Sequence, residues 1–134
     1  MSNSKFLLFV FLGVVFWFNG VLTVRFLGPT LLTSNNPNLI WAYALVIPIT
    51  VLTLVITRFV GQTPYHQLLK PIVIMTYTAT ICDGIALSWF RSLYSSSIDI
   101  ALHGAALILW GGGLGLLFAH ILELMHTRSK QISQ

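Results

Sequence analysis

Four apolar runs, each close to the length of a membrane-crossing helix, dominate this chain of 134 residues. They cover residues 6–24, 39–57, 71–90 and 98–122, and about 20 helical residues cross the ~30 Å hydrocarbon core of a bilayer. Inside that core the backbone amides of a separate run must bond within the run itself, which favours α-helices. The sequence therefore predicts an all-α membrane protein, a single domain built as an antiparallel four-transmembrane-helix bundle.

The composition agrees with a chain surrounded by lipid. Hydrophobic residues make up 56% and charged residues 7% of the sequence, whereas soluble domains contain roughly a quarter charged residues. The net charge of +4 comes from basic residues scattered at the ends of the apolar runs. We therefore expect the lipid bilayer as the main partner and no nucleic acid.

Turn and capping residues predict where the helices begin and end. Arg25 is expected to end the first helix, so that Gly28-Pro29 lies in the connection that follows. Asn36, which precedes a proline, is a candidate N-cap for the second helix. Ser96 with Asp99 fits a capping box at the start of the fourth helix.

The basic residues predict the orientation in the membrane. Four spans place both termini and the middle connection on one side. Five basic residues lie on that side and two on the other, and the side richer in lysine and arginine is normally cytoplasmic. The five are Lys5, Arg58, Lys70, Arg128 and Lys130, and the two are Arg25 and Arg91. We expect a multi-pass protein of the cell membrane with cytoplasmic N- and C-termini.

A carboxylate, Asp83, lies inside the third apolar run. An acid at the centre of a membrane helix costs about 2.5–3.5 kcal/mol on insertion scales, so it normally faces protein or water and has a partner. Four polar residues on the other spans are expected at a similar depth, in the outer half of the membrane. The sequence thus predicts a buried polar cluster made of Asn19, Arg25, Tyr43, Asp83 and His103.

Two interpretations of Asp83 remain open. A bond to Arg25 or Asn19 would hold helices together, whereas a water-accessible Asp83 could act in transport or proton handling. Threonines recur at helical spacing on two spans and could line a narrow aqueous path, although such threonines more often bond the carbonyl one turn earlier. These polar stripes are Thr50, Thr53 and Thr57 on the second span, and Thr76 and Thr80 on the third.

Small residues form one face of the fourth span, at Gly104, Gly111, Gly115 and Ala119. Such a face allows two helices to approach closely, so it predicts packing against another span or against a second copy of the chain. Near the end of this span, His120, Glu123 and His126 recur every three residues. Helical metal-binding motifs place their two histidines four residues apart, so we expect no metal site and no cofactor.

Three short motifs carry a resemblance to a known family. They are Val24-Arg25-Phe26-Leu27-Gly28, Cys82-Asp83-Gly84-Ile85-Ala86-Leu87 with Phe90 and Tyr94, and Ala105-Ala106-Leu107-Ile108-Leu109-Trp110-Gly111. Together they resemble a family of small bacterial four-span integral membrane proteins of unknown function. The resemblance implies four membrane helices and a polar position at Asp83, and supplies no activity. The chain is also similar in size to small multidrug transporters, but their first-span glutamate is missing here.

The sequence contains no nucleophile elbow, paired catalytic carboxylates or Cys-His arrangement, so we expect no enzyme. The favoured interpretation is a structural or accessory helix bundle whose small-residue face on the fourth span packs helices or a partner, and a homo-oligomer or a larger membrane protein is the possible partner. The alternative is a small transporter or proton-coupled carrier using Asp83. A third class, lipid or pigment binding, is suggested only by the aromatic residues Phe16, Phe18, Trp89 and Trp110. A cavity beside Asp83 would favour the carrier, and a basic partner would favour the bundle.

Overall fold

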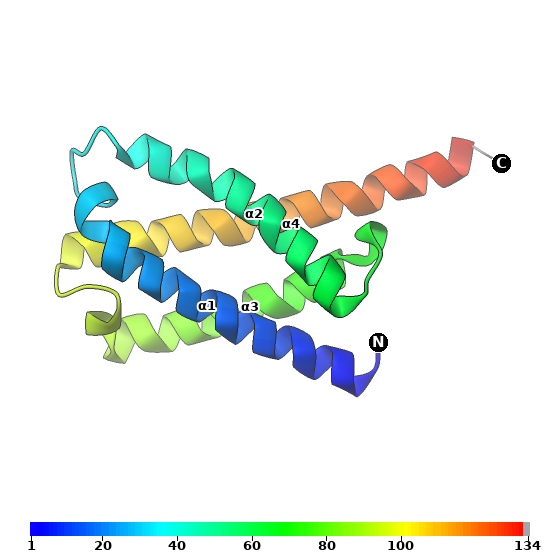
Figure 1. Cartoon of the computed structure of the whole chain (residues 1–134), viewed down its shortest axis with the longest axis horizontal. Helices are drawn as coiled ribbons and strands as arrows, with labels where there is room; N and C mark the ends of the chain where they lie inside the picture. Colours follow the sequence, from blue (N-terminus) through cyan, green and yellow to red (C-terminus); the bar gives the residue numbers. More distant parts are fainter. Residues whose placement is uncertain (133–134) are drawn as a thin grey trace.

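The computed structural model describes residues 1–132 and shows four long helices that run back and forth past one another (Figure 1). The all-α four-helix bundle predicted from the sequence is confirmed, and no strand occurs within these residues. The helices are α1 (Asn3–Leu31), α2 (Leu39–Gly61), α3 (Leu69–Trp89) and α4 (Ile98–Ile132), and two 3-10 turns, η1 (Tyr65–Gln67) and η2 (Arg91–Leu93), lie in the connections on either side of α3.

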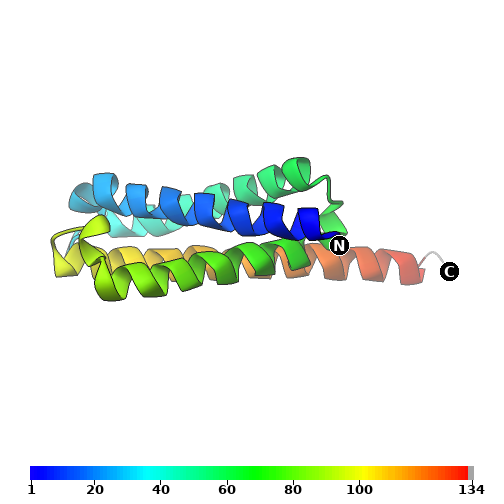
Figure 2. The ribbon, with the colours of Figure 1, turned by 90° about the horizontal axis from the view of Figure 1, so that it is seen from below.

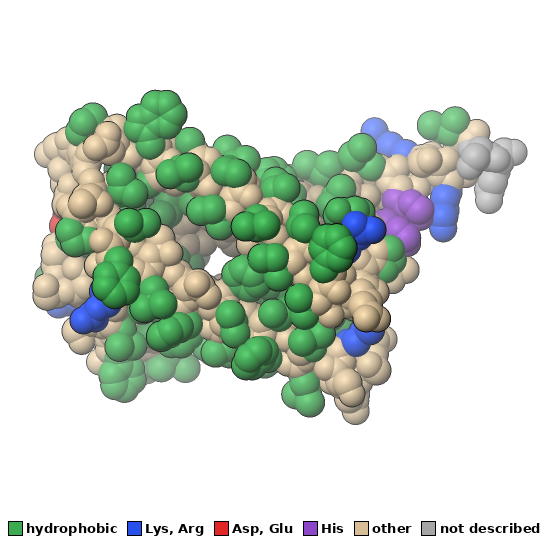
Figure 3. Space-filling model, in the orientation of Figure 1, with side chains coloured by type: hydrophobic (Ala, Val, Ile, Leu, Met, Phe, Trp, Pro, Cys, Tyr) green, Lys and Arg blue, Asp and Glu red, His purple; other side chains and the backbone are tan. Residues whose placement is uncertain are grey.

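The outer surface of the helices is apolar. All four helices are long and apolar enough to cross a membrane, and large side chains such as Phe26, Ile40 and Leu109 point outward. Figure 3 shows hydrophobic side chains over the middle of this face, with lysine and arginine side chains toward its two ends. An apolar surface of this extent is unfavourable in water and favourable in lipid. The architecture is that of a multi-pass membrane protein.

The helices form two layers, with α1 and α2 in one and α3 and α4 in the other (Figure 2). Across the layers, α1 packs most extensively on α3 and α2 on α4. The α1–α2 and α3–α4 connections lie at one end of the bundle, whereas both termini and η1 lie toward the other end (Figure 1). This arrangement brings the middle of every helix to the centre of the molecule.

Two separate hydrophobic cores hold the bundle together, one toward each end. The core at the end with the termini is built around Phe9, Leu68 and Met75. The core at the other end is built around Val24, Leu32 and Tyr94. Of these residues, Phe9, Leu68 and Tyr94 are completely buried. The middle of the bundle lies between these cores and is packed less tightly.

Glycines allow close approach of the helices beside each core. A Cβ atom added at Gly13 of α1 would lie 2.9 Å from the Met75 carbonyl oxygen and 2.9 Å from the Thr78 Cβ on α3. A Cβ added at Gly104 of α4 would lie 2.5 Å from Val24 Cγ1 on α1. Real Cβ atoms do not come this close to other heavy atoms. Small residues are therefore required where α1 crosses α3 and α4.

The first helix continues beyond Arg25, contrary to the expectation that it ends there. α1 extends through Pro29 to Leu31 and ends with the Leu32 N–H donating to the Gly28 carbonyl at 2.8 Å. Close to a helix end, a proline removes only one hydrogen bond. Packing of Gly28 against Ile100 of α4 keeps this last turn in place. Hydropathy marks the apolar part of a helix and not its hydrogen-bonded end.

The predicted caps of α2 and α4 are also corrected. α2 begins at Leu39, and Asn36 instead shapes the preceding turn, where its Oδ1 accepts from the Asn38 N–H at 2.9 Å. For α4, Ser97 rather than Ser96 lies next to the first turn and accepts from the Ile100 N–H at 3.4 Å. Asp99 instead accepts from both the backbone N–H and the hydroxyl of Ser34, which ties α4 to the α1–α2 connection.

Replacement of Gly13 by alanine should destabilise the bundle by about 1–3 kcal/mol, because the added methyl group meets the α3 backbone and forces the helices apart. The matched control is Gly84→Ala on α3, where a Cβ meets nothing within 4 Å. That change should be neutral or stabilise by up to ~1 kcal/mol through helix propensity. Thermal unfolding in detergent measures both, and equal melting temperatures for the two variants would contradict the close contact.

Candidate functional site: a cavity beside Asp83

Asp83 is buried, with 8% of its surface exposed, and its hydrogen-bond partner is a tyrosine. The hydroxyl of Tyr94, which is completely buried, donates to Asp83 Oδ1. The indole Nε1–H of Trp17 in turn donates to the Tyr94 hydroxyl oxygen at 3.0 Å. A chain of two hydrogen bonds therefore connects α1, the segment after η2 and the carboxylate on α3.

Arg25 holds the segment that carries Tyr94. After α3 ends, the chain folds back through η2, and the Arg25 guanidinium donates to the carbonyl oxygens of Ser92 at 3.1 Å and Leu93 at 3.2 Å. Burial and the hydrogen bond to Asp83 raise the pKa of Tyr94 above its ordinary value. The phenol therefore stays protonated at neutral pH and acts as the donor to Asp83.

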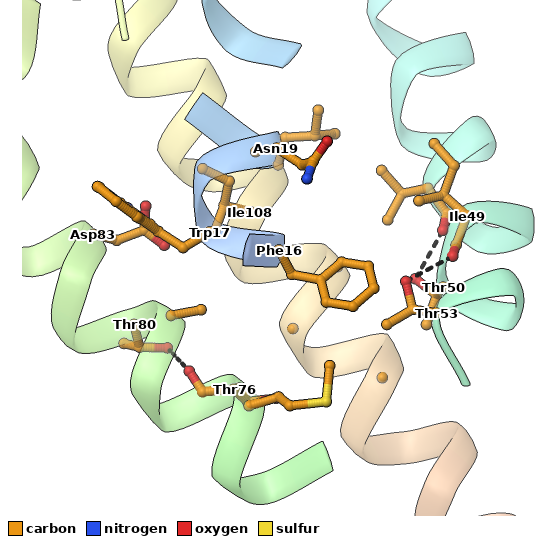
Figure 4. Close-up of a pocket in the computed structure, with 18 of the residues that line it drawn as sticks. Phe16, Trp17, Asn19, Ile49, Thr50, Thr53, Thr76, Thr80, Asp83 and Ile108 are labelled. Atoms are coloured by element: carbon orange, nitrogen blue, oxygen red, sulfur yellow. Dashed lines mark hydrogen bonds between the residues drawn. The ribbon is translucent and has the colours of Figure 1, made fainter. Parts of the chain in front are cut away.

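A cavity of about 280 Å³ lies at the centre of the bundle, and Asp83 is part of its wall. In Figure 4, Trp17 lies next to Asp83 on one side of this space, with Thr50 and Thr53 of α2 on the other. The space-filling view is hollowed in the same middle region (Figure 3). All four helices contribute to the wall, which includes Phe16, Asn19, Gly20, Leu54, Ile72, Met75, Ala79, Ile108, Gly111, Gly112 and Gly115.

Four of the five stripe threonines also line this cavity: Thr50, Thr53, Thr76 and Thr80. Thr57, the fifth, is buried in the packed region, where its hydroxyl donates to the Thr53 carbonyl at 2.7 Å. The Thr50, Thr53 and Thr80 hydroxyls each donate to the carbonyl one turn earlier, at 2.8–3.0 Å. Four stripe threonines therefore line the cavity, and the hydroxyl protons of three of them are used within the helices.

In the described part of the chain, residues 1–132, the five residues of the predicted polar cluster form no hydrogen bond or ion pair with one another. Asn19 lines the cavity with Asp83, but its amide donates to the Val15 carbonyl at 2.9 Å. Arg25 binds η2 as described. Tyr43 packs on Trp110, with 6.0 Å between ring centroids, and His103 Nδ1 lies 3.3 Å from Asp99 Oδ1. Residues at the same depth in the membrane do not necessarily meet, because depth does not determine toward which neighbour each side chain points around its helix.

The small residues of α4 face the other helices of the same chain. An added Cβ at Gly111 would contact Val46 of α2, and one at Gly115 would contact Ile72 of α3. Gly104 lies against Val24 of α1, and Ala119 is completely buried. This face is therefore occupied within the bundle and is not left open for a second copy.

Two features of this region were missed from the sequence. Tyr94 was noted only as part of the family resemblance, and Trp17 was not considered as a donor to it. The available signal was their chemistry, since buried tyrosine and tryptophan need partners for their polar atoms. A further contact, remote from the cavity, was also not predicted: His126 of α4 stacks on His66 of η1, with ring centroids 3.8 Å apart.

Comparisons with known proteins do not assign this chain to a family. No protein-family model, no curated protein and no solved structure matches it. The similarity to small four-span membrane proteins thus rests on the short motifs alone.

Replacement of Tyr94 by phenylalanine should destabilise the protein by about 1–2 kcal/mol, because both Asp83 and Trp17 lose a buried partner. Tyr77→Phe is the matched control: Tyr77 is exposed on α3, and its hydroxyl has no partner within the described structure. If the hydrogen bonds act as one unit, Trp17→Phe and Tyr94→Phe will be non-additive in thermal unfolding. Equal effects of the Tyr94 and Tyr77 changes would contradict the described network.

Proposed function

We propose that this protein is a non-enzymatic binding protein or carrier of the membrane that accommodates a small, largely apolar molecule beside Asp83. The observation that carries the proposal is the cavity of about 280 Å³ with a carboxylate in its wall. Small-molecule sites have volumes from roughly 300 Å³ upward, with mostly apolar walls and a few polar groups. At about 280 Å³ the cavity is just below that range, and it is about twice the volume of an engineered ~150 Å³ cavity that binds benzene.

The position of Asp83 allows binding in addition to the structural hydrogen bond that it accepts from Tyr94. A carboxylate between membrane helices is often neutralised by a basic side chain. Arg25, the candidate for such a pair, bonds instead to the carbonyls of Ser92 and Leu93. Asp83 retains its place in the cavity wall, where a ligand can reach it.

The accessory-protein interpretation has less support. The small-residue face of the fourth span was expected to pack helices or a partner. Gly104, Gly115 and Ala119 are buried against the protein's own helices, so this face does not support a partner. An oligomer remains compatible with the apolar outer surface. Carriage across the membrane by a bundle this small would be expected to use more than one copy, so we include a homo-oligomer in the proposal.

Filling the cavity should abolish binding. Gly112 lines the cavity, and its added Cβ would lie 3.6 Å from Thr76 Cγ2, so Gly112→Leu places a side chain in the empty space without a backbone clash. We expect affinity for a small aromatic probe, such as neopentylbenzene or benzyltrimethylammonium, to fall roughly tenfold or more, since overpacking costs about 1–3 kcal/mol. Equilibrium dialysis of detergent-solubilised protein measures the affinity.

Gly113→Leu provides the matched control for this experiment. The neighbouring glycine is exposed, and its added Cβ meets nothing within 4 Å, so the same side chain points away from the cavity. Its affinity for the probes should equal that of the unchanged protein. Identical binding by both leucine variants would place the probe outside the cavity and end the proposal.

We also infer that the N- and C-termini are cytoplasmic. The support is the distribution of basic residues, which are more numerous toward the end of the bundle that holds the termini (Figure 3). Fusion of a reporter that is active only in the cytoplasm to either terminus should give activity. Fusion after Ser34, in the α1–α2 connection, should give none, and the reverse pattern would overturn the orientation.

A further inference from the structure

Most threonine hydroxyls of the cavity-lining residues already donate within their own helices. The hydroxyls of Thr50, Thr53 and Thr80 donate to carbonyls of their own helices, and so does Thr23, to the Asn19 carbonyl at 2.8 Å. A hydroxyl whose proton is used in this way offers only lone pairs to the cavity. The exceptions are the Thr76 hydroxyl and the second amide hydrogen of Asn19. The cavity-lining residues therefore have few donors left for a ligand.

The acidic group in the cavity wall, Asp83, has no cationic partner within residues 1–132. Asp83 accepts one hydrogen bond, through Oδ1, from the neutral hydroxyl of Tyr94. No lysine, arginine or histidine among residues 1–132 lies within ion-pair distance of this carboxylate. The neutral donor orients the carboxylate and supplies no positive charge, so a cation that enters the cavity would stabilise the ionised form of Asp83, and an anion would not.

The rest of the wall is apolar and aromatic. Phe16 and Trp17 of α1 and Met75 of α3 all line the cavity, and Figure 4 shows the Phe16 ring directed toward its middle. Aromatic faces attract organic cations, most strongly where water is excluded. A bare metal cation such as Ca²⁺ would instead need six or more oxygen ligands gathered around one point. The threonine oxygens are distributed over α2 and α3 and do not supply such a shell.

We propose that the ligand is a small organic cation, with an ammonium-type group beside Asp83 and an apolar body against Phe16 and Met75. This inference rests on the proposed function, because it names the class of molecule that the cavity binds. It excludes organic anions, which Asp83 repels, and sugars, whose hydroxyls require donors as well as acceptors.

The experiment compares two molecules of equal shape that differ in charge. Benzyltrimethylammonium carries a quaternary nitrogen, and neopentylbenzene has a carbon atom in its place. Binding to the unchanged protein in detergent is measured by equilibrium dialysis, and nonspecific partition into the micelle is subtracted using the Gly112→Leu protein. We expect the cation to bind roughly tenfold tighter or more, and 4-tert-butylbenzoate, an anion of similar size, to show no specific binding.

Asp83→Asn should remove the preference for the cation while leaving the neutral molecule bound. The matched control is Glu123→Gln, because Glu123 lies on α4 outside the cavity, and this variant should keep the preference. If Asp83→Asn fails to fold, the comparison of the two probes on the unchanged protein still decides the charge preference, because it requires no change at Asp83.

The outcomes separate this inference from the proposed function. Equal or tighter binding of neopentylbenzene would overturn the cation proposal and leave the binding cavity intact. Displacement of the organic cation by sodium ions, but not by the bulky cation N-methylglucamine, would identify an inorganic cation site and also overturn it. Specific binding of neither aromatic probe would overturn both proposals together.

Discussion

The hydrogen bond from Tyr94 to Asp83 determines how one end of this bundle is assembled. A carboxylate between membrane helices must be solvated by protein, and here the donor comes from the segment that follows the helix carrying the acid. To reach Asp83, the chain must fold back through η2, and Arg25 holds η2 there by its carbonyls. The core around Val24 and Leu32 then forms around the buried Tyr94 ring. The need to solvate Asp83 thus determines the positions of η2, of Arg25 and of the hydrophobic core around Tyr94.

The cavity follows from where the helices can approach one another. Contacts at Gly13 on one side and at Gly28 and Gly104 on the other bring α1 onto α3 and α4 at separated points. Between those points lies the cavity, and small residues in its wall such as Ala79 and Gly112 leave the space unfilled. The crossing arrangement of the two layers therefore closes both ends of the bundle and leaves its middle open.

The limits of prediction from this sequence have physical causes. Hydropathy identified four spans, because bilayer thickness imposes a length on every apolar helix. It placed the end of the first helix too early, because Arg25 remains helical while its side chain bonds η2. Asp83 was identified by its charge, but Tyr94 was not recognised as its partner, because Tyr94 lies beyond the apolar run and reaches the acid only after the chain reverses. To predict such a contact, one must know toward which neighbour each side chain points around its helix. The hydrophobic periodicity does not give this direction, because the helices are apolar on all sides.

The space at the centre of the bundle is not an enclosed void. The penalty of roughly 24 cal/mol per Å³ applies to enclosed voids, whereas this space of about 280 Å³ is open between wall residues such as Asn19, Ile49 and Thr80, which are exposed. A single leucine at Gly112 would fill part of this space without meeting the backbone of a neighbouring helix. The small residues around Asp83 leave contacts unmade, and a molecule that occupies the space would supply them.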